Sequence, residues 1–285
     1  MRRRPPRPLL VTAAILAAAV TGCGTPAPDP TASDIPSLAV GQIPAPAQRS
    51  PSSAAPPAAG SVPAPAGSAA AASAAAGSAS GDTASDDYAD PSAATVVVNK
   101  RRPLTPIDYT PADLVLPKVP LATDRVNATL RPDAAEAVEE MFAAAADDDV
   151  WLTLVSGYRS YPVQAATYDY WVSRNGSPED ADNYSARPGF SEHQTGLAFD
   201  ISQDDGACTL RSCFRDTTAA GWAAANAHEF GFILRYPEGR QDTTGFLAES
   251  WHYRFVGTDT SSAMRADGVE TLEEFFGLPD APDYG

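Results

Sequence analysis

The chain has 285 residues, among them 27 prolines and 20 glycines, and carries a formal net charge of −16. This length allows one or two domains. The acidic surplus argues against nucleic acid or an anionic membrane surface as a partner, because either would repel the chain.

The N-terminus has the pattern of an export signal. Basic residues precede an apolar run that is too short for a membrane-spanning helix. The run ends in VTGC (20–23), which resembles the bacterial lipobox, where cleavage precedes a cysteine that carries a lipid. We therefore interpret residues 1–22 as a lipoprotein-type signal peptide and Cys23 as the lipidated residue. An ordinary signal peptide with an incidental cysteine is the alternative. Lipidation would place the protein outside the cytoplasm, anchored to the outer face of the bacterial cytoplasmic membrane.

Residues 23–93 are rich in proline, alanine, serine and glycine and contain almost no aromatic side chains. Such a segment cannot bury enough apolar surface to offset the entropy lost on folding, so we interpret it as a disordered tether. The apolar and aromatic residues gather after it, which predicts one folded domain over residues 94–285.

The domain is predicted to contain helices and short strands. Pro132 suits the first turn of a helix, while Gly176 and Gly231 suit the left-handed position that follows one. In chain order we expect a strand at 96–98, a helix from 132, a strand at 151–155, a helix at 161–175, a strand at 196–201, a helix at 217–230 and a strand at 250–256. Helices and strands do not alternate strictly, which favours an α+β fold with a small, largely antiparallel sheet and packed helices.

The two cysteines of the domain, Cys208 and Cys213, are predicted to form a disulfide, because an exported protein meets an oxidising compartment. The loop between them is short, so the bond would contribute about 2 kcal/mol and shape one loop rather than hold the domain together. Two free thiols are the alternative.

The candidate chemistry lies in two short stretches. In SEHQTGLAFD, His193 is followed by Asp200, and a turn across Gly196 could bring the two side chains together. In AESWHYR, Glu249 precedes His252. A lone histidine on a strand is more often a packed core residue than a ligand. Two histidines with one carboxylate are nevertheless a recurrent catalytic zinc set, which leaves the fourth position open to water.

Four stretches in this order resemble the VanY-type zinc D-alanyl-D-alanine carboxypeptidases: SGYRSYPVQ (156–164), PGFSEHQTGLAFD (188–200), GFILRYP (231–237) and ESWHYRFVG (249–257). They include the S-x-H-x-x-G-x-A-x-D and E-x-W-H patterns of the wider group of peptidoglycan metallopeptidases. The resemblance covers about residues 94–278 and leaves the signal and tether outside.

The resemblance implies one zinc ion bound by His193, Asp200 and His252, with Glu249 as the general base. It also implies that Arg159 stabilises the oxyanion of the tetrahedral intermediate. Gln164 and Ser191 would hold the substrate, and Trp251 would form a wall of the cleft. The chain departs from the family at Ser250, where proline is usual, and at Phe190, where histidine is common. We expect these departures to affect the aim of the base and the rim of the pocket rather than metal binding.

The expected function is a zinc-dependent D,D-carboxypeptidase that removes the terminal D-alanine from peptidoglycan stem peptides, acting as a monomer. Two alternatives stay open. One is an L,D-carboxypeptidase acting on tetrapeptide stems, and the other is a cell-wall binding module without turnover. The presence of all the proposed ligands together with Glu249 disfavours the binding module.

Overall fold

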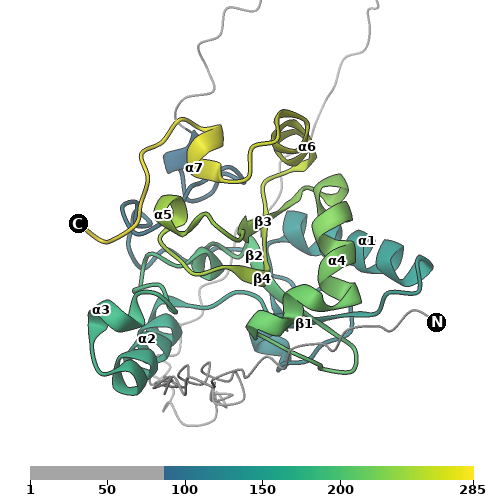
Figure 1. Ribbon diagram of the computed structural model, residues 1–285, viewed down its shortest axis with the longest axis horizontal. Helices are drawn as coiled ribbons and strands as arrows, with labels where there is room; N and C mark the ends of the chain where they lie inside the picture. Colours follow the sequence, from purple (N-terminus) through teal and green to yellow (C-terminus); the bar gives the residue numbers. More distant parts are fainter. Residues whose placement is uncertain (1–86) are drawn as a thin grey trace, which may run out of the picture.

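The computed structural model describes residues 87–285, in which helices surround an open four-stranded antiparallel sheet (Figure 1). The predicted α+β fold is confirmed. The strands are β1 (Leu152–Ser156), β2 (Ala198–Gln203), β3 (Phe232–Tyr236) and β4 (Glu249–Phe255), in the order β1-β2-β4-β3. The α-helices are α1 (Pro132–Asp147), α2 (Tyr161–Asn175), α3 (Pro178–Ala181), α4 (Thr218–Asn226), α5 (Gln241–Thr244), α6 (Thr258–Asp267) and α7 (Leu272–Phe275). Short 3₁₀ helices are η2 (Asp87–Ala89), η3 (Arg125–Ala128), η4 (Glu192–Thr195), η5 (Ser212–Asp216) and η6 (Ala227–Phe230).

Successive side chains of β2 and β4 point to opposite faces of the sheet, so one face packs in the core and the other carries the site. Phe199 of β2 lies opposite Tyr253 of β4, and both side chains belong to the main hydrophobic core. The next pair in the register is Asp200 opposite His252. Because successive side chains of a strand point to opposite faces, these two polar residues project from the face away from that core.

The main core lies between the sheet and the helices α1 and α4, which Figure 1 shows on the same side of the molecule. One face of α1 is apolar and buried, including Val138, Met141 and Ala145, each at 0% exposure. Helix α4 contributes alanines, whose small side chains let it approach the sheet closely. In the view of Figure 1, α2 and α3 lie on the opposite side from α4. Among residues 87–285, no helix has the length and apolar character needed to cross a membrane.

Three details of the predicted elements were wrong. Residues 96–98 are buried but form no strand, because the carbonyl of Val96 accepts a hydrogen bond from the Arg254 side chain rather than from a neighbouring strand. Strand β3 was not predicted. The helix expected at 217–230 ends as an α-helix at Asn226 and continues as the 3₁₀ turn η6, which Gly231 terminates with a φ of 82°.

The signal peptide, Cys23 and residues 23–86 of the predicted tether lie outside the described residues. The described part begins before the predicted boundary at residue 94 and already contacts the domain there. The ring of Tyr88 lies 6.1 Å from that of Phe276, and the carbonyl of Ser92 accepts a hydrogen bond from Arg131 at 2.6 Å.

Candidate metal centre and active site

Two neighbouring strands and one 3₁₀ turn bring the three predicted ligands together. Asp200 and His252 are cross-strand partners in β2 and β4, and His193 lies in η4 just before β2. The turn ends at Gly196, whose φ of 71° lets the chain reverse into β2. A side chain there would also crowd Leu114, because an added Cβ would lie 3.0 Å from its Cδ2. The predicted turn across Gly196 is therefore what carries the imidazole to the carboxylate.

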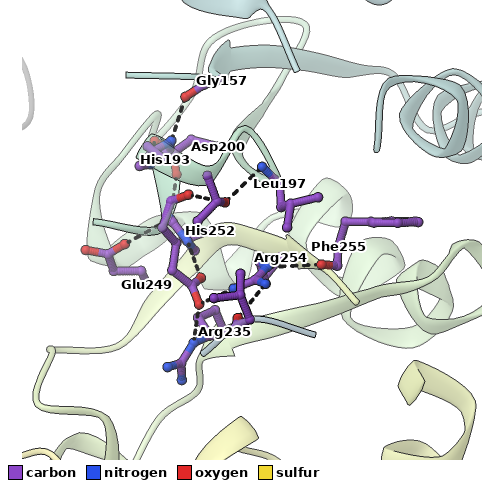
Figure 2. Close-up of polar contacts among 12 residues, drawn as sticks. Gly157, His193, Leu197, Asp200, Arg235, Glu249, His252, Arg254 and Phe255 are labelled. Atoms are coloured by element: carbon purple, nitrogen blue, oxygen red, sulfur yellow. Dashed lines mark hydrogen bonds and ion pairs between the residues drawn. The ribbon is translucent and has the colours of Figure 1, made fainter. Parts of the chain in front are cut away.

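The distances from the two histidines to Asp200 are close to those between adjacent ligands of a tetrahedral metal. His193 Nε2 lies 3.4 Å from Asp200 Oδ2, and His252 Nδ1 lies 3.1 Å from Asp200 Oδ1. Ligand atoms of all three residues lie within 4.8 Å of one another, and all three side chains are buried. Bonds of about 2.0–2.1 Å to a tetrahedral zinc would separate adjacent ligand atoms by about 3.3 Å. Figure 2 shows the three side chains pointing toward a common centre.

Hydrogen bonds select the imidazole tautomers that metal binding needs. The Nδ1 of His193 lies 2.8 Å from the carbonyl oxygen of Gly157, so Nδ1 donates its proton and Nε2 keeps a lone pair directed at the centre. The Nε2 of His252 lies 3.3 Å from a carboxylate oxygen of Glu192, so Nδ1 is the atom left to face Asp200. Such outer partners orient metal-binding histidines and fix their protonation. The donor set therefore fits zinc.

The pKa values in the centre are perturbed as expected for three ligands sharing a buried space. Burial lowers the pKa of His252, but hydrogen bonds to Asp200 and Glu192 outweigh it and raise the pKa to about 9. Burial raises the pKa of Asp200, but the two histidines outweigh it and hold that pKa well below its usual range. Burial lowers the pKa of His193. Without a metal, a proton on His252 faces Asp200, and zinc binding must displace it.

Glu192 is a central residue of the site that sequence reasoning missed. Its side chain is fully buried, and its Oε1 accepts from Arg235 Nε and Arg254 Nη1, each at 2.8 Å. Burial raises the pKa of Glu192, but the two arginines and His252 outweigh it, so the carboxyl stays ionised. This carboxylate is what holds the N–H of His252.

The arginines around Glu192 belong to a larger buried network. Arg235 also forms two hydrogen bonds with Glu273, at 2.7 and 3.0 Å, and Arg254 donates to the carbonyls of Ala94, Val96 and Phe255. Two arginines thus balance two carboxylates behind the ligands, and Figure 2 shows Arg235 and Arg254 on the side of His252 away from His193. The available signal was an arginine inside each of two apolar strands, FILRY and HYRFV, since a buried arginine requires a buried carboxylate.

Glu249 lies where a general base is needed. It is the first residue of β4, and its Oε2 is 3.7 Å from His252 Nδ1. Burial raises the pKa of Glu249, with Asp200 and Glu192 adding to the rise against His252 and Arg159, and the result is about 7. A carboxyl group with a pKa near neutrality can both accept and return a proton at physiological pH.

Arg159 reaches the same cleft from the segment between β1 and α2. Its Nη2 donates to Ser156 Oγ and its Nη1 to Gln164 Oε1, each at 3.1 Å. Gln164 is 1% exposed, and its amide nitrogen donates to Ser185 Oγ at 3.3 Å and to the carbonyl of Ala186 at 2.6 Å. Both ends of the Gln164 amide are thus bound within the protein, where they position Arg159, and a direct contact of Gln164 with substrate stays a prediction.

The centre opens into a cleft of about 850 Å³. Ser191 and Trp251 line it, as does Ser250, one of the two departures from the family pattern. A contact of Ser191 with substrate stays a prediction. Phe190, the other departure, packs edge-on against Tyr284 at 5.0 Å and is not among the residues that line the cleft. An effect of Phe190 on the pocket rim stays a prediction.

The predicted disulfide is present. Cys208 and Cys213 are bonded, with their Cα atoms 5.6 Å apart. The loop that they close follows β2 and runs into the first turn of η5, and its residues Leu210 and Arg211 line the cleft.

Comparisons with known proteins agree with this geometry. Residues 127–258 match the family model of VanY, D-alanyl-D-alanine carboxypeptidase. YodJ of Bacillus subtilis (strain 168), assigned as a carboxypeptidase, is 40% identical over 189 residues, which cover 66% of this chain and 68% of YodJ. The structure of the LdcB LD-carboxypeptidase superposes with a TM-score of 0.62 at 38% identity, covering 67% of this chain and 88% of that one. A variant of a vancomycin resistance D,D-pentapeptidase, VanY, in complex with Zn(II) superposes with a TM-score of 0.50 at 29% identity, covering 64% of this chain and 98% of that one. The chain is therefore an enzyme that belongs to the VanY family of D-alanyl-D-alanine carboxypeptidases.

Proposed function

We propose that this protein is a zinc-dependent D,D-carboxypeptidase that removes the terminal D-alanine from peptidoglycan stem peptides. The observation that carries the proposal is the convergence of His193, Asp200 and His252 beside Glu249 at the base of one cleft. When bound, zinc would polarise the scissile carbonyl and lower the pKa of a water molecule. One ion per domain fits the single ligand group found among residues 87–285.

The residues around the ligands have complementary roles in this proposal. Glu249 accepts a proton from the attacking water and returns it to the leaving amine, which its pKa of about 7 allows. Arg159 donates hydrogen bonds to the oxygen that becomes negative in the transition state. Glu192 keeps His252 in the tautomer that binds metal.

The stereochemical preference is the second question, because the similar structures include both an LD-carboxypeptidase and a D,D-pentapeptidase. The L,D alternative has a specific observation in its favour, the higher TM-score and identity of the LdcB enzyme. The test is mass-spectrometric analysis of a pentapeptide ending in D-Ala-D-Ala and of the matching tetrapeptide, with chelator and with zinc restored. Release of D-alanine from the pentapeptide that stops on chelation supports the D,D assignment, and release from the tetrapeptide alone supports the L,D assignment.

A cell-wall binding module without turnover is separated from both by Glu249→Ala. We expect this variant to bind zinc and peptide but to release no D-alanine. If it complemented a deletion strain as well as the wild type does, the binding role would be correct and the enzymatic proposal would fall.

We further propose that residues 1–22 direct export, that Cys23 carries the lipid anchor, and that the enzyme acts as a monomer outside the cytoplasmic membrane. Residues 1–86 lie outside the described structure, so this proposal rests on their sequence alone. Metabolic labelling with a fatty acid tests the anchor, with Cys23→Ala as the control. Loss of label and release from membranes in that variant would support the lipid anchor. Sedimentation equilibrium would test whether the enzyme is a monomer.

A further inference from the structure

The cleft extends well beyond the metal ligands. Trp171 and Tyr184, whose rings stack at 5.4 Å, line one part of it. The loop closed by Cys208 and Cys213 lines another part, together with α4. Clefts of about 300–1,000 Å³ hold drug-sized ligands, so a volume of about 850 Å³ accommodates several residues of a peptide rather than the terminal one alone.

Among residues 87–285, one cation of this cleft has no protein partner for its side chain. Arg159 is bonded to Ser156 and Gln164, and Arg215 forms an ion pair with Glu238 at 2.7 Å. Arg211 also lines the cleft and is partly buried. Within residues 87–285, its guanidinium makes neither an ion pair nor a side-chain hydrogen bond. Its five N–H donors are therefore available to a ligand.

The loop that carries Arg211 is held in place. The disulfide closes it, and two residues other than glycine adopt left-handed backbone conformations, Cys208 with a φ of 57° and Leu210 with a φ of 52°. Such conformations persist only where the surrounding structure imposes them. The backbone N–H of Arg211 donates to the carbonyl of Cys208 at 3.1 Å, and its carbonyl accepts from Phe214, which is fully buried. The guanidinium is thus carried by a backbone that needs little ordering when a ligand binds.

The negative charge of the whole chain makes a cation without a protein partner in the cleft a guide to the charge of the ligand. With a formal net charge of −16, the protein repels acidic ligands at long range. An unpaired arginine inside the cleft offers a local site where a carboxylate is favoured, because guanidinium and carboxylate form two parallel hydrogen bonds.

We infer that Arg211 binds a side-chain carboxylate of the peptide, on a residue upstream of the scissile bond, and so makes the enzyme selective for acidic peptides. This inference rests on the proposed function for the direction in which the peptide lies. Arg211 does not touch the reacting atoms in this arrangement, so it determines specificity and acts on KM rather than on kcat.

The test uses the full-length zinc-loaded enzyme and pentapeptides that end in D-Ala-D-Ala. Peptides are compared in pairs that differ only in a free carboxylate or a carboxamide on the side chain of the second or third residue. Wild type, Arg211→Gln and Arg211→Lys are measured, with Arg265→Gln as a control for net charge, since Arg265 is exposed on α6 and outside the cleft. Dissociation constants are measured by calorimetry for the same set in a Glu249→Ala background, which separates binding from turnover.

We expect wild type to favour one free carboxylate over its carboxamide by about tenfold in KM and in dissociation constant, the range for a charge-assisted hydrogen bond. Arg211→Gln should abolish this preference with kcat unchanged, Arg211→Lys should retain part of it, and Arg265→Gln should retain all of it. A preference that survives in Arg211→Gln, or a wild type indifferent to every exchange, overturns the inference. If no peptide is cleaved but the binding preference depends on Arg211, the inference stands and the proposed function fails. If no peptide binds, both fail.

Discussion

Replacing Glu192 by glutamine tests whether the buried network behind the ligands controls metal binding. The substitution keeps the shape and removes the charge. Glutamine would direct its carbonyl oxygen at Arg235 and Arg254, which both lie 2.8 Å from Oε1. Its amide nitrogen then faces the Nε2 of His252, in place of an oxygen 3.3 Å away. An amide that donates to Nε2 favours the proton on Nδ1, which is the wrong tautomer for the metal.

Two effects of different size follow. Removing one partner of a buried ion pair costs about 3–5 kcal/mol, and we expect the lower end because Arg235 keeps Glu273 and Arg254 keeps three backbone carbonyls. A loss of about 3 kcal/mol lowers the melting temperature of a domain this size by about 6–12 °C. Zinc affinity should fall by about 10–100-fold, as is typical when an outer partner of a ligand is lost.

The assays are urea unfolding of the metal-free protein and zinc competition against a chromophoric chelator. Glu270→Gln is the matched control, because that carboxylate is exposed and pairs with Arg240 at 2.8 Å, so its loss should change stability by less than about 1 kcal/mol. A folded Glu192→Gln protein with wild-type zinc affinity would refute the tautomer argument, whatever its stability.

Four further predictions concern the general base Glu249, the backbone support of His193, a glycine in α4 and the placement of Arg159. The pKa of Glu249 is raised from 4.5 to about 7, so its ionisation opposes folding. The free energy of unfolding of the metal-free protein should therefore fall as the pH rises from about 4.5 to 7. Metal-free Glu249→Gln should lose less of this free energy over the same interval, as measured in denaturant titrations. An added Cβ at Gly157 would lie 2.6 Å from a backbone oxygen, so Gly157→Ala should cost about 1–3 kcal/mol and weaken zinc binding in the chelator assay. At Gly221 of α4 the Cβ would meet nothing within 4 Å, so Gly221→Ala should stabilise the protein by up to about 1 kcal/mol. Gln164→Ala should lower kcat by about tenfold with zinc affinity unchanged, because Arg159 loses one hydrogen bond that aims it, and unchanged kcat would contradict this role.

The ligands and the base could be predicted from the sequence because their chemistry is carried by rare residues in short motifs. The chain has three histidines, and two of them lie in stretches that also supply Asp200 and Glu249. The strands around Asp200 and His252 were likewise predicted, at 196–201 and 250–256. These motifs are local in the sequence. The antiparallel register of β2 against β4 then places Asp200 opposite His252 and so brings the motifs together in one site.

The outer network could not be predicted in the same way, because its partners are distant in the sequence. Nothing in the sequence distinguishes Glu192 and Glu273 from ordinary surface carboxylates. In the structure each of them forms an ion pair with Arg235. Gln164 resembled a substrate-binding residue, and only the structure shows its amide occupied by Arg159, Ser185 and Ala186. Residues 96–98 have the composition of a strand, but their backbone bonds to the Arg254 side chain and to the carbonyls of Tyr88 and Ala93 rather than to a neighbouring strand.

The pairing of Asp200 with His252 couples metal binding to the fidelity of folding. Side chains on a strand alternate between faces, so a slip of one residue between β2 and β4 would turn the carboxylate toward the aromatic core and bring Phe199 to the cleft. A chain misaligned in this way would have no place for a zinc ion. The correctly aligned sheet can therefore gain stability by binding a metal ion, while misaligned sheets gain none. The supply of zinc would then shift the folded population toward the correct register.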